Sequence, residues 1–205
     1  MGLGKRILPF LKIRKGIIHI GANDGGECAW YDQLKFERVL WFEPIKDVFL
    51  KLQENIAKYP NQMAMNFGIH DTLKTAKLHV SSNRGLSSSI LEFGTHKELR
   101  PDITYIRDEV IDLVRMDEII NKEFAKHFNF IVIDTQGVEL NVLKSFGDLL
   151  YGFDYIFTEV YTDEGYKGCA LLPEIDQYLL GYGFKRMDYF VDRKWHWGDA
   201  FYVKN

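Results

Sequence analysis

A doubly wound α/β fold is what this sequence predicts, with a mostly parallel seven-stranded sheet, helices on both faces and an antiparallel hairpin at the carboxyl end. Short apolar runs alternate with stretches whose apolar residues recur at helical spacing, which is typical of βαβ units. Several of these runs end in glycine or a carboxylate, and the last two follow one another with no helix between them. The 205 residues suit a single domain spanning residues 1–205.

The first half of the chain opens with an apolar run closed by glycines, which indicates a buried strand. After the second apolar run, Pro44 disfavours helix at Glu43, so Glu43 is expected to be extended at the strand end. Val48, Leu52 and Ile56 then recur at helical spacing. We expect strands over residues 16–20, 38–42 and 62–67, and helices over 27–35 and 47–58.

The second half begins less regularly and then returns to alternating strands and helices. Pro173 falls in the first turn of a helix, where proline is tolerated. We expect strands over residues 76–80, 110–115, 130–133 and 155–158, a polar loop over 81–89, helices from 117, over 137–149 and over 173–180, and a hairpin of 184–190 with 200–203.

Charge and cysteine content narrow the function classes. A net charge of −3 argues against a protein that binds nucleic-acid phosphates. Cys28 and Cys169 form no Cys-x-x-Cys pair, so we expect neither a zinc site nor a disulfide, and a cytoplasmic location. Residues 1–15 mix basic and apolar side chains without a run long enough for a signal peptide or membrane span. They are expected to pack as an extension before the first strand, without stable membrane insertion.

Two strand ends in the first half predict a nucleoside site. Ligands of such folds bind beyond the carboxyl ends of parallel strands. The loop after the first strand lets backbone approach a ligand closely, because it contains glycine. Glu43, about twenty residues on, is placed to accept hydrogen bonds from ribose hydroxyls. The expected loop contacts are Gly21, Ala22, Asn23, Asp24 and Gly25.

The side chains of this loop favour S-adenosylmethionine over a dinucleotide. A pyrophosphate site requires Gly-x-Gly-x-x-Gly, and Asn23 stands at the position of the second glycine. Asp24 would repel a pyrophosphate. S-adenosylmethionine has no phosphate and carries positive charge on its amine and sulfonium, so the Asn-Asp pair suits it better. An NAD-type dehydrogenase is disfavoured on the same grounds.

Two carboxylates at later strand ends are candidates for chemistry. Asp134 and Glu159 follow adjacent predicted strands and are expected to face one cleft. A sugar hydroxyl is a poor nucleophile, so a general base would help its methylation. The pair could instead hold a divalent cation, but two carboxylates do not make a cage, so direct base catalysis is preferred and no metal site is assigned. His196, between two tryptophans, is a third candidate; an exposed hairpin histidine explains it equally well.

Four motifs, in this order and spacing, resemble the FkbM family of methyltransferases from about residue 16 to 203. They are Ile20 to Gly25, then Phe42, Glu43 and Pro44, then Gly85 to Ser89, then Asp134, Thr135, Gln136, Gly137, Val138 and Glu139. Thr135 and Val138 stand where the family often has Val and Ala. The resemblance implies a Rossmann-like class I methyltransferase fold, S-adenosylmethionine as donor with S-adenosylhomocysteine as product, and O-methylation of sugar or glycan hydroxyls.

The resemblance also extends the expected donor site. Pro44, Asp134 and Gln136 belong to its motifs and are expected to contact the donor, and Ser87 and Ser88 are expected to line the donor pocket. Gly68 lies at a strand end expected to border the adenine.

Three alternatives stay open at this point. The acceptor could be a lipid, peptide or small metabolite. The chain could be a catalytically inactive nucleoside-binding scaffold, although its intact carboxylates argue against this. An adenine-N6 DNA methyltransferase is disfavoured, because Asp134 to Gly137 do not form the Asn/Asp-Pro-Pro-aromatic motif. An exposed aromatic patch would also permit a homodimer.

Overall fold

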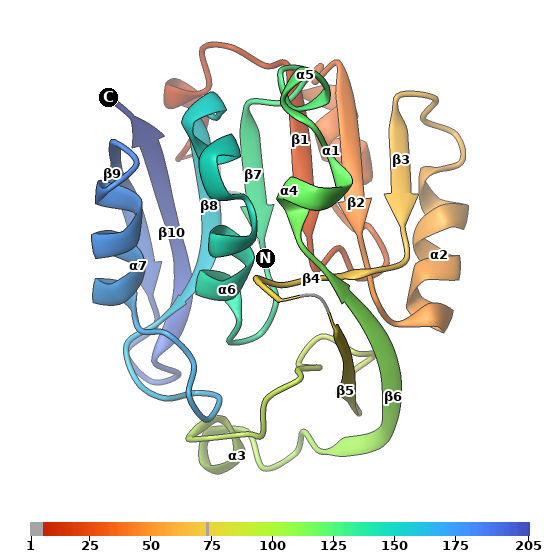
Figure 1. The fold of residues 1–205 in the computed structure, drawn as a ribbon. Helices are drawn as coiled ribbons and strands as arrows, with labels where there is room; N and C mark the ends of the chain where they lie inside the picture. Colours follow the sequence, from red (N-terminus) through yellow and green to blue (C-terminus); the bar gives the residue numbers. More distant parts are fainter. Residues whose placement is uncertain (1–5, 73) are drawn as a thin grey trace.

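The computed structural model, which describes residues 6–72 and 74–205, contains a seven-stranded sheet and a smaller three-stranded one (Figure 1). The large sheet has the strand order β3-β2-β1-β7-β8-β10-β9. Its first five strands are parallel, and β10 is antiparallel to both of its neighbours. This confirms the expected sheet and terminal hairpin. The strands are β1 (Gly16–Ile20), β2 (Arg38–Phe42), β3 (Gln62–Met65), β7 (Phe130–Ile133), β8 (Tyr155–Tyr161), β9 (Phe184–Val191) and β10 (Trp197–Lys204).

Helices cover both faces of the large sheet, as expected. Tyr31 and Leu52, from α1 and α2, belong to one buried apolar cluster, and Val142 and Ile175, from α6 and α7, belong to another. Figure 1 shows α6 and α7 in front of the sheet and α1 behind it. The helices are α1 (Cys28–Gln33), α2 (Lys46–Ile56), α3 (His96–Leu99), α4 (Met116–Ile119), α5 (Lys122–Ala125), α6 (Glu139–Ser145) and α7 (Leu172–Leu180), with 3₁₀ turns at Leu8–Phe10 and Gly147–Gly152.

The three-stranded sheet is a feature that the sequence did not predict. It consists of β4 (Gly68–Ile69), β6 (Tyr105–Val114) and β5 (Lys74–Ser81), in that order, with β5 and β6 antiparallel. Strands were expected over 76–80 and 110–115, but no local pattern says which sheet a strand joins. This sheet lies beyond the carboxyl ends of β1, β2 and β7 (Figure 1). Leu78, Ile111 and Leu113 pack there against Ile45 and Val48 of the α2 segment.

Several expected boundaries are wrong: the strand expected over 110–115 spans Tyr105–Val114, and the strand expected over 62–67 ends at Met65. Two further differences bear on the site. The helix expected over 137–149 spans only Glu139–Ser145, because Gly147, at φ +48°, cannot continue an α-helix and a 3₁₀ turn follows. Glu159 was expected just after a strand, but β8 extends to Tyr161 because β10 pairs with it along its whole length. Glu159 therefore lies inside a buried strand.

The described part of the N-terminal extension packs on the large sheet. Ile7 and Leu11 are buried in the same cluster as Phe130 of β7, and Phe10 packs against Phe201 of β10. The expectation for residues 1–5 lies outside the described residues. Among residues 6–72 and 74–205, no helix is both long and apolar enough to cross a membrane.

Candidate active site

A cavity of about 690 Å³ lies between the carboxyl ends of β1, β2 and β7 and the three-stranded sheet. Eight residues expected to bind the donor line it: Gly21, Asn23, Glu43, Pro44, Gly68, Ser88, Asp134 and Gln136. Four other residues expected to bind the donor do not line it: Ala22, Asp24, Gly25 and Ser87. An apolar wall of Leu78, Ile90, Ile111 and Leu113 was missed by sequence analysis, because it depends on the second sheet.

The turn after β1 requires glycine at its first position. Gly21 has φ +77°, and a Cβ added there would lie 1.8 Å from the carbonyl oxygen of Asp134. Its amide donates to the Phe42 carbonyl at 3.0 Å, which ties the turn to the end of β2. Asn23, also at positive φ, donates from Nδ2 to the Arg84 carbonyl at 3.3 Å. The turn is thereby joined to the serine loop that forms another wall.

Glu43 is held at the cavity by two backbone amides. Its Oε2 accepts from the amide of Asn23 at 2.9 Å, and its Oε1 accepts from the amide of Ile45 at 2.8 Å. The side chain is only 4% exposed, and burial raises its pKa to about 7. Because each carboxylate oxygen has a second lone pair, both can still accept a hydrogen bond from a ligand hydroxyl.

The serines of residues 81–89 mainly order their own loop. Ser88 Oγ accepts from the Ser81 amide at 3.0 Å, and Ser87 Oγ accepts from Asn83 Nδ2 at 3.0 Å. Ser89 Oγ donates to the carbonyl of Gln136 at 2.7 Å. The loop therefore fixes the wall of the cavity and the turn after β7 together.

The structure brings Asp134 and Glu159 together through Gln136. Nε2 of Gln136 lies 2.6 Å from Asp134 Oδ1 and 2.7 Å from Glu159 Oε2. The Tyr161 hydroxyl also donates to Glu159 Oε2. Asp134 and Gln136 line the cavity and Glu159 does not. Of the two carboxylates, Asp134 is therefore the one that a cavity ligand can reach.

Burial raises the pKa of each carboxyl group in this cluster. For Asp134 a hydrogen bond from Gln136 opposes the increase. The pKa of Glu159 is raised well above its ordinary value, first by burial and then by the charge of Asp134. Asp199, opposite Glu159 in the β10–β8 register, was missed by sequence analysis; burial raises its pKa to about 7. Glu159 is therefore the group that holds a proton most firmly.

Glu139 stabilises the turn that carries Gln136. Its carboxylate accepts from the amides of Thr135 and Gly137 at 3.1 Å, and the side chain is 1% exposed. Gln136 and Gly137 have φ of +56° and +105°, so this turn adopts a conformation that costs free energy without such support. No sequence motif predicted this positioning contact, although it joins residues only two to four positions apart.

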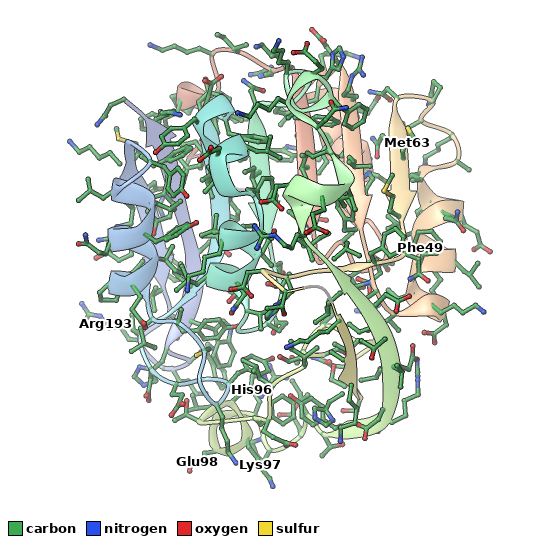
Figure 2. The ribbon with its side chains drawn as sticks, viewed as in Figure 1. Phe49, Met63, His96, Lys97, Glu98 and Arg193 are labelled. Carbon is green, nitrogen blue, oxygen red and sulfur yellow. The ribbon has the colours of Figure 1, made fainter. Side chains whose placement is uncertain are left out.

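His196 is not brought to the cavity. It lies exposed in the β9–β10 turn at φ +64°, and its backbone carbonyl accepts from the amide of Thr162 at 2.9 Å. Figure 2 shows Arg193, in the same turn, at the margin of the molecule. A catalytic role for His196 stays a prediction that no contact in the site supports.

The cavity wall, as far as the structure describes it, contains acidic side chains and no strongly basic ones. Its described residues include two carboxyl groups, Glu43 and Asp134, and neither Lys nor Arg. The pKa of His70, the remaining titratable residue of the wall, is lowered by burial. Within the described ranges, no three or more His, Cys, Asp or Glu side chains are grouped so that they could hold a metal ion. The wall is therefore suited to a cationic ligand and unsuited to a pyrophosphate.

Known proteins resemble this chain in sequence or in structure. A 2-O-methyltransferase, NoeI of Sinorhizobium fredii, is 24% identical over 159 residues, which cover 74% of this chain and 65% of that protein. The chain thus spans slightly less than two thirds of that relative. A ribosomal protein L11 methylase from Lactobacillus delbrueckii has a TM-score of 0.54 at 12% identity, over 97% of this chain and 75% of the other.

Magnesium protoporphyrin IX methyltransferase of Synechocystis, solved with bound S-adenosylmethionine, has a TM-score of 0.52 at 9% identity, over 92% of this chain and 69% of the other. At such identities the likeness concerns the fold alone, and it leaves the acceptor open, nucleic acids included. The methyltransferase FkbM domain matches residues 19–186, most of the chain. The chain belongs to the FkbM methyltransferase family.

Proposed function

We propose that this protein transfers a methyl group from S-adenosylmethionine to a hydroxyl of a sugar or glycan. The observation that carries the proposal is the anionic cavity, with Glu43 at the end of β2 and Asp134 at the end of β7. The sugar acceptor is supported by the FkbM motifs and by the 2-O-methyltransferase named above.

The residues present fit the donor. Glu43 offers two oxygens, each already oriented by a backbone amide, to the two ribose hydroxyls. Gly68, Ile69 and the apolar side chains of the second sheet suit a flat adenine ring. A wall without Lys or Arg favours a sulfonium and disfavours phosphates.

Asp134 is the residue that we assign as proton acceptor. S-adenosylmethionine supplies a methyl group already activated by its sulfonium. Asp134 reaches the cavity, and its carboxylate would take the proton of the acceptor hydroxyl as the oxygen becomes methylated. Glu159, outside the cavity, would act through Gln136 and not directly on the acceptor.

The position of the Gln136 amide favours a role for Asp134 as a base over a cation bound between Asp134 and Glu159. Nε2 of Gln136 lies within 2.7 Å of both carboxylates, so its N–H groups occupy the space that a shared cation would need. Asp134 and Glu159 are thus already bridged by a neutral donor.

A transfer assay with labelled S-adenosylmethionine and a panel of monosaccharides and oligosaccharides tests the proposal. For the acceptor that is methylated, Asp134→Asn should lower kcat by on the order of 100-fold or more while donor binding is retained. Asp148→Asn, on an exposed site, is the matched control and should keep the full rate. Methylation of lipids, peptides or RNA but no sugar would refute the acceptor class, and a full rate in Asp134→Asn would refute the assigned base.

A further inference from the structure

Tyr166, in the loop after β8, points its hydroxyl at the bridge between the two carboxylates. The side chain is fully buried, and its hydroxyl lies 2.7 Å from Gln136 Oε1 and 3.2 Å from the Ser87 carbonyl. Burial raises the pKa of Tyr166 well above its ordinary value, so the hydroxyl keeps its proton and acts as a donor. The shorter contact makes Gln136 its main acceptor.

The Gln136 carboxamide can serve both carboxylates in only one orientation. Its amino end donates to Asp134 and Glu159, and its oxygen end then faces Tyr166. If the amide were flipped, its oxygen would face two acidic oxygens, and neither carboxyl group would receive a hydrogen bond from Gln136. A hydroxyl donor at the oxygen end stabilises the productive orientation.

We propose that Tyr166 is a positioning residue, whose hydroxyl orients the Gln136 carboxamide so that its amino group is shared between Asp134 and Glu159. The use of Asp134 as proton acceptor rests on the proposed function, whereas the hydrogen-bond chain does not. The loop after β8 thereby helps to set the protonation state of Asp134, although Tyr166 itself does not line the cavity.

The surroundings explain why this one amide matters. Among the described side chains, the titratable groups that interact with Asp134 come from the turn before α1, from the segment just after β2, from α6, β8 and β10, and from the loop after β8; they are Glu27, Glu43, Glu139, Glu159, Asp199 and Tyr166. All are acids, so each ionised one disfavours ionisation of Asp134. The hydrogen bond from Gln136 acts in the opposite direction and lowers the pKa of Asp134.

Carbon-13 NMR of protein labelled at the Asp carboxyl carbons tests the proposal, with Asp134→Asn used to assign the Asp134 signal. In Tyr166→Phe the pKa of Asp134 should rise by on the order of half a unit or more, because Gln136 loses its orienting donor. Tyr31→Phe is the matched control. Tyr31 is equally buried, its hydroxyl lies 3.1 Å from His19 Nδ1, and it should leave the pKa of Asp134 unchanged.

A second variant keeps the test decisive if Tyr166→Phe folds poorly. Gln136→Met keeps the side-chain length, removes the amide and should raise the pKa of Asp134 at least as much. Adding Tyr166→Phe to Gln136→Met should cause no further rise, since both act through one amide. An unchanged pKa in Tyr166→Phe, or an equal rise in Tyr31→Phe, would overturn the proposal. A rise in a protein that methylates no sugar would refute the proposed function and leave the positioning role intact.

Discussion

At the scale of the residue, Glu43 shows which features of the site can be predicted from residues adjacent in the sequence. Pro44 disfavours helix at Glu43, so the end of β2 and the place of the carboxylate follow from two adjacent residues. The structure adds the amides of Asn23 and Ile45, which hold both oxygens. The contacts of Tyr166 and Asp199 could not be predicted in this way, because they join segments that lie far apart in the sequence.

The pKa of Glu43, raised to about 7 by burial, makes donor binding depend on pH. The carboxylate accepts the ribose hydroxyls better than the protonated acid does, so binding favours the ionised form. Below pH 7 the free protein must first release this proton, and the Kd for S-adenosylhomocysteine should increase as pH falls, by up to about tenfold per unit. Calorimetric titrations between pH 5.5 and 8.5 measure this. Glu43→Gln should bind S-adenosylhomocysteine more weakly at pH 8, and its Kd should no longer show this contribution to the pH dependence. The same change of Kd with pH in the variant as in wild type would contradict the prediction.

At the scale of the element, the turn after β1 requires glycine because the carbonyl oxygen of Asp134 lies close to Gly21. The sequence predicted a glycine turn here. It did not predict the contact with Asp134, since that residue belongs to the distant segment after β7. The second sheet was likewise not predicted from the sequence. β5 and β6 each have the sequence pattern of a strand, but no local pattern shows that these distant segments pair with one another.

Gly21→Ala should therefore destabilise the protein strongly. The new methyl group would lie 1.8 Å from a backbone oxygen, so strands β1 and β7 would have to separate there. We expect a loss of about 3 to 5 kcal/mol in the free energy of unfolding, measured by urea denaturation. Gly168→Ala is matched in φ, at +78°, but its methyl group would contact nothing within 4 Å, and a loss of about 1 kcal/mol is expected from strain alone. Equal losses in the two variants would show that the close approach has no effect.

At the scale of the whole molecule, the site concentrates buried acids at one edge of the large sheet. Burial raises the pKa of Glu43, Glu139 and Asp199 to about 7 each. The parallel sheet, its helices and the terminal hairpin were predictable, because they follow from hydrophobic period and strand order. The grouping of acids was predictable only for those at strand ends.

These acids make stability depend on pH, and Glu139 is the clearest case. Below about pH 4.5 its carboxyl group is protonated in the folded and unfolded chain alike. Between about 4.5 and 7 only the unfolded chain ionises it, so the free energy of unfolding falls as pH rises, by up to about 1.4 kcal/mol per unit. Above pH 7 this contribution stays constant. Denaturation experiments on wild type and Glu139→Gln measure this. Between pH 4.5 and 7 the free energy of unfolding of the wild type should fall relative to that of Glu139→Gln. A difference between the two proteins that does not depend on pH would contradict the prediction.

The anionic cavity between the two sheets is assigned to S-adenosylmethionine, and calorimetric titration of the wild-type protein at pH 8 is the decisive measurement of that assignment. Saturable binding of S-adenosylmethionine with one site per chain, weakened on the order of tenfold or more in Glu43→Gln, and no binding of NAD, is the result expected. Binding of NAD without binding of S-adenosylmethionine, or equal binding of S-adenosylmethionine in wild type and Glu43→Gln, would contradict it.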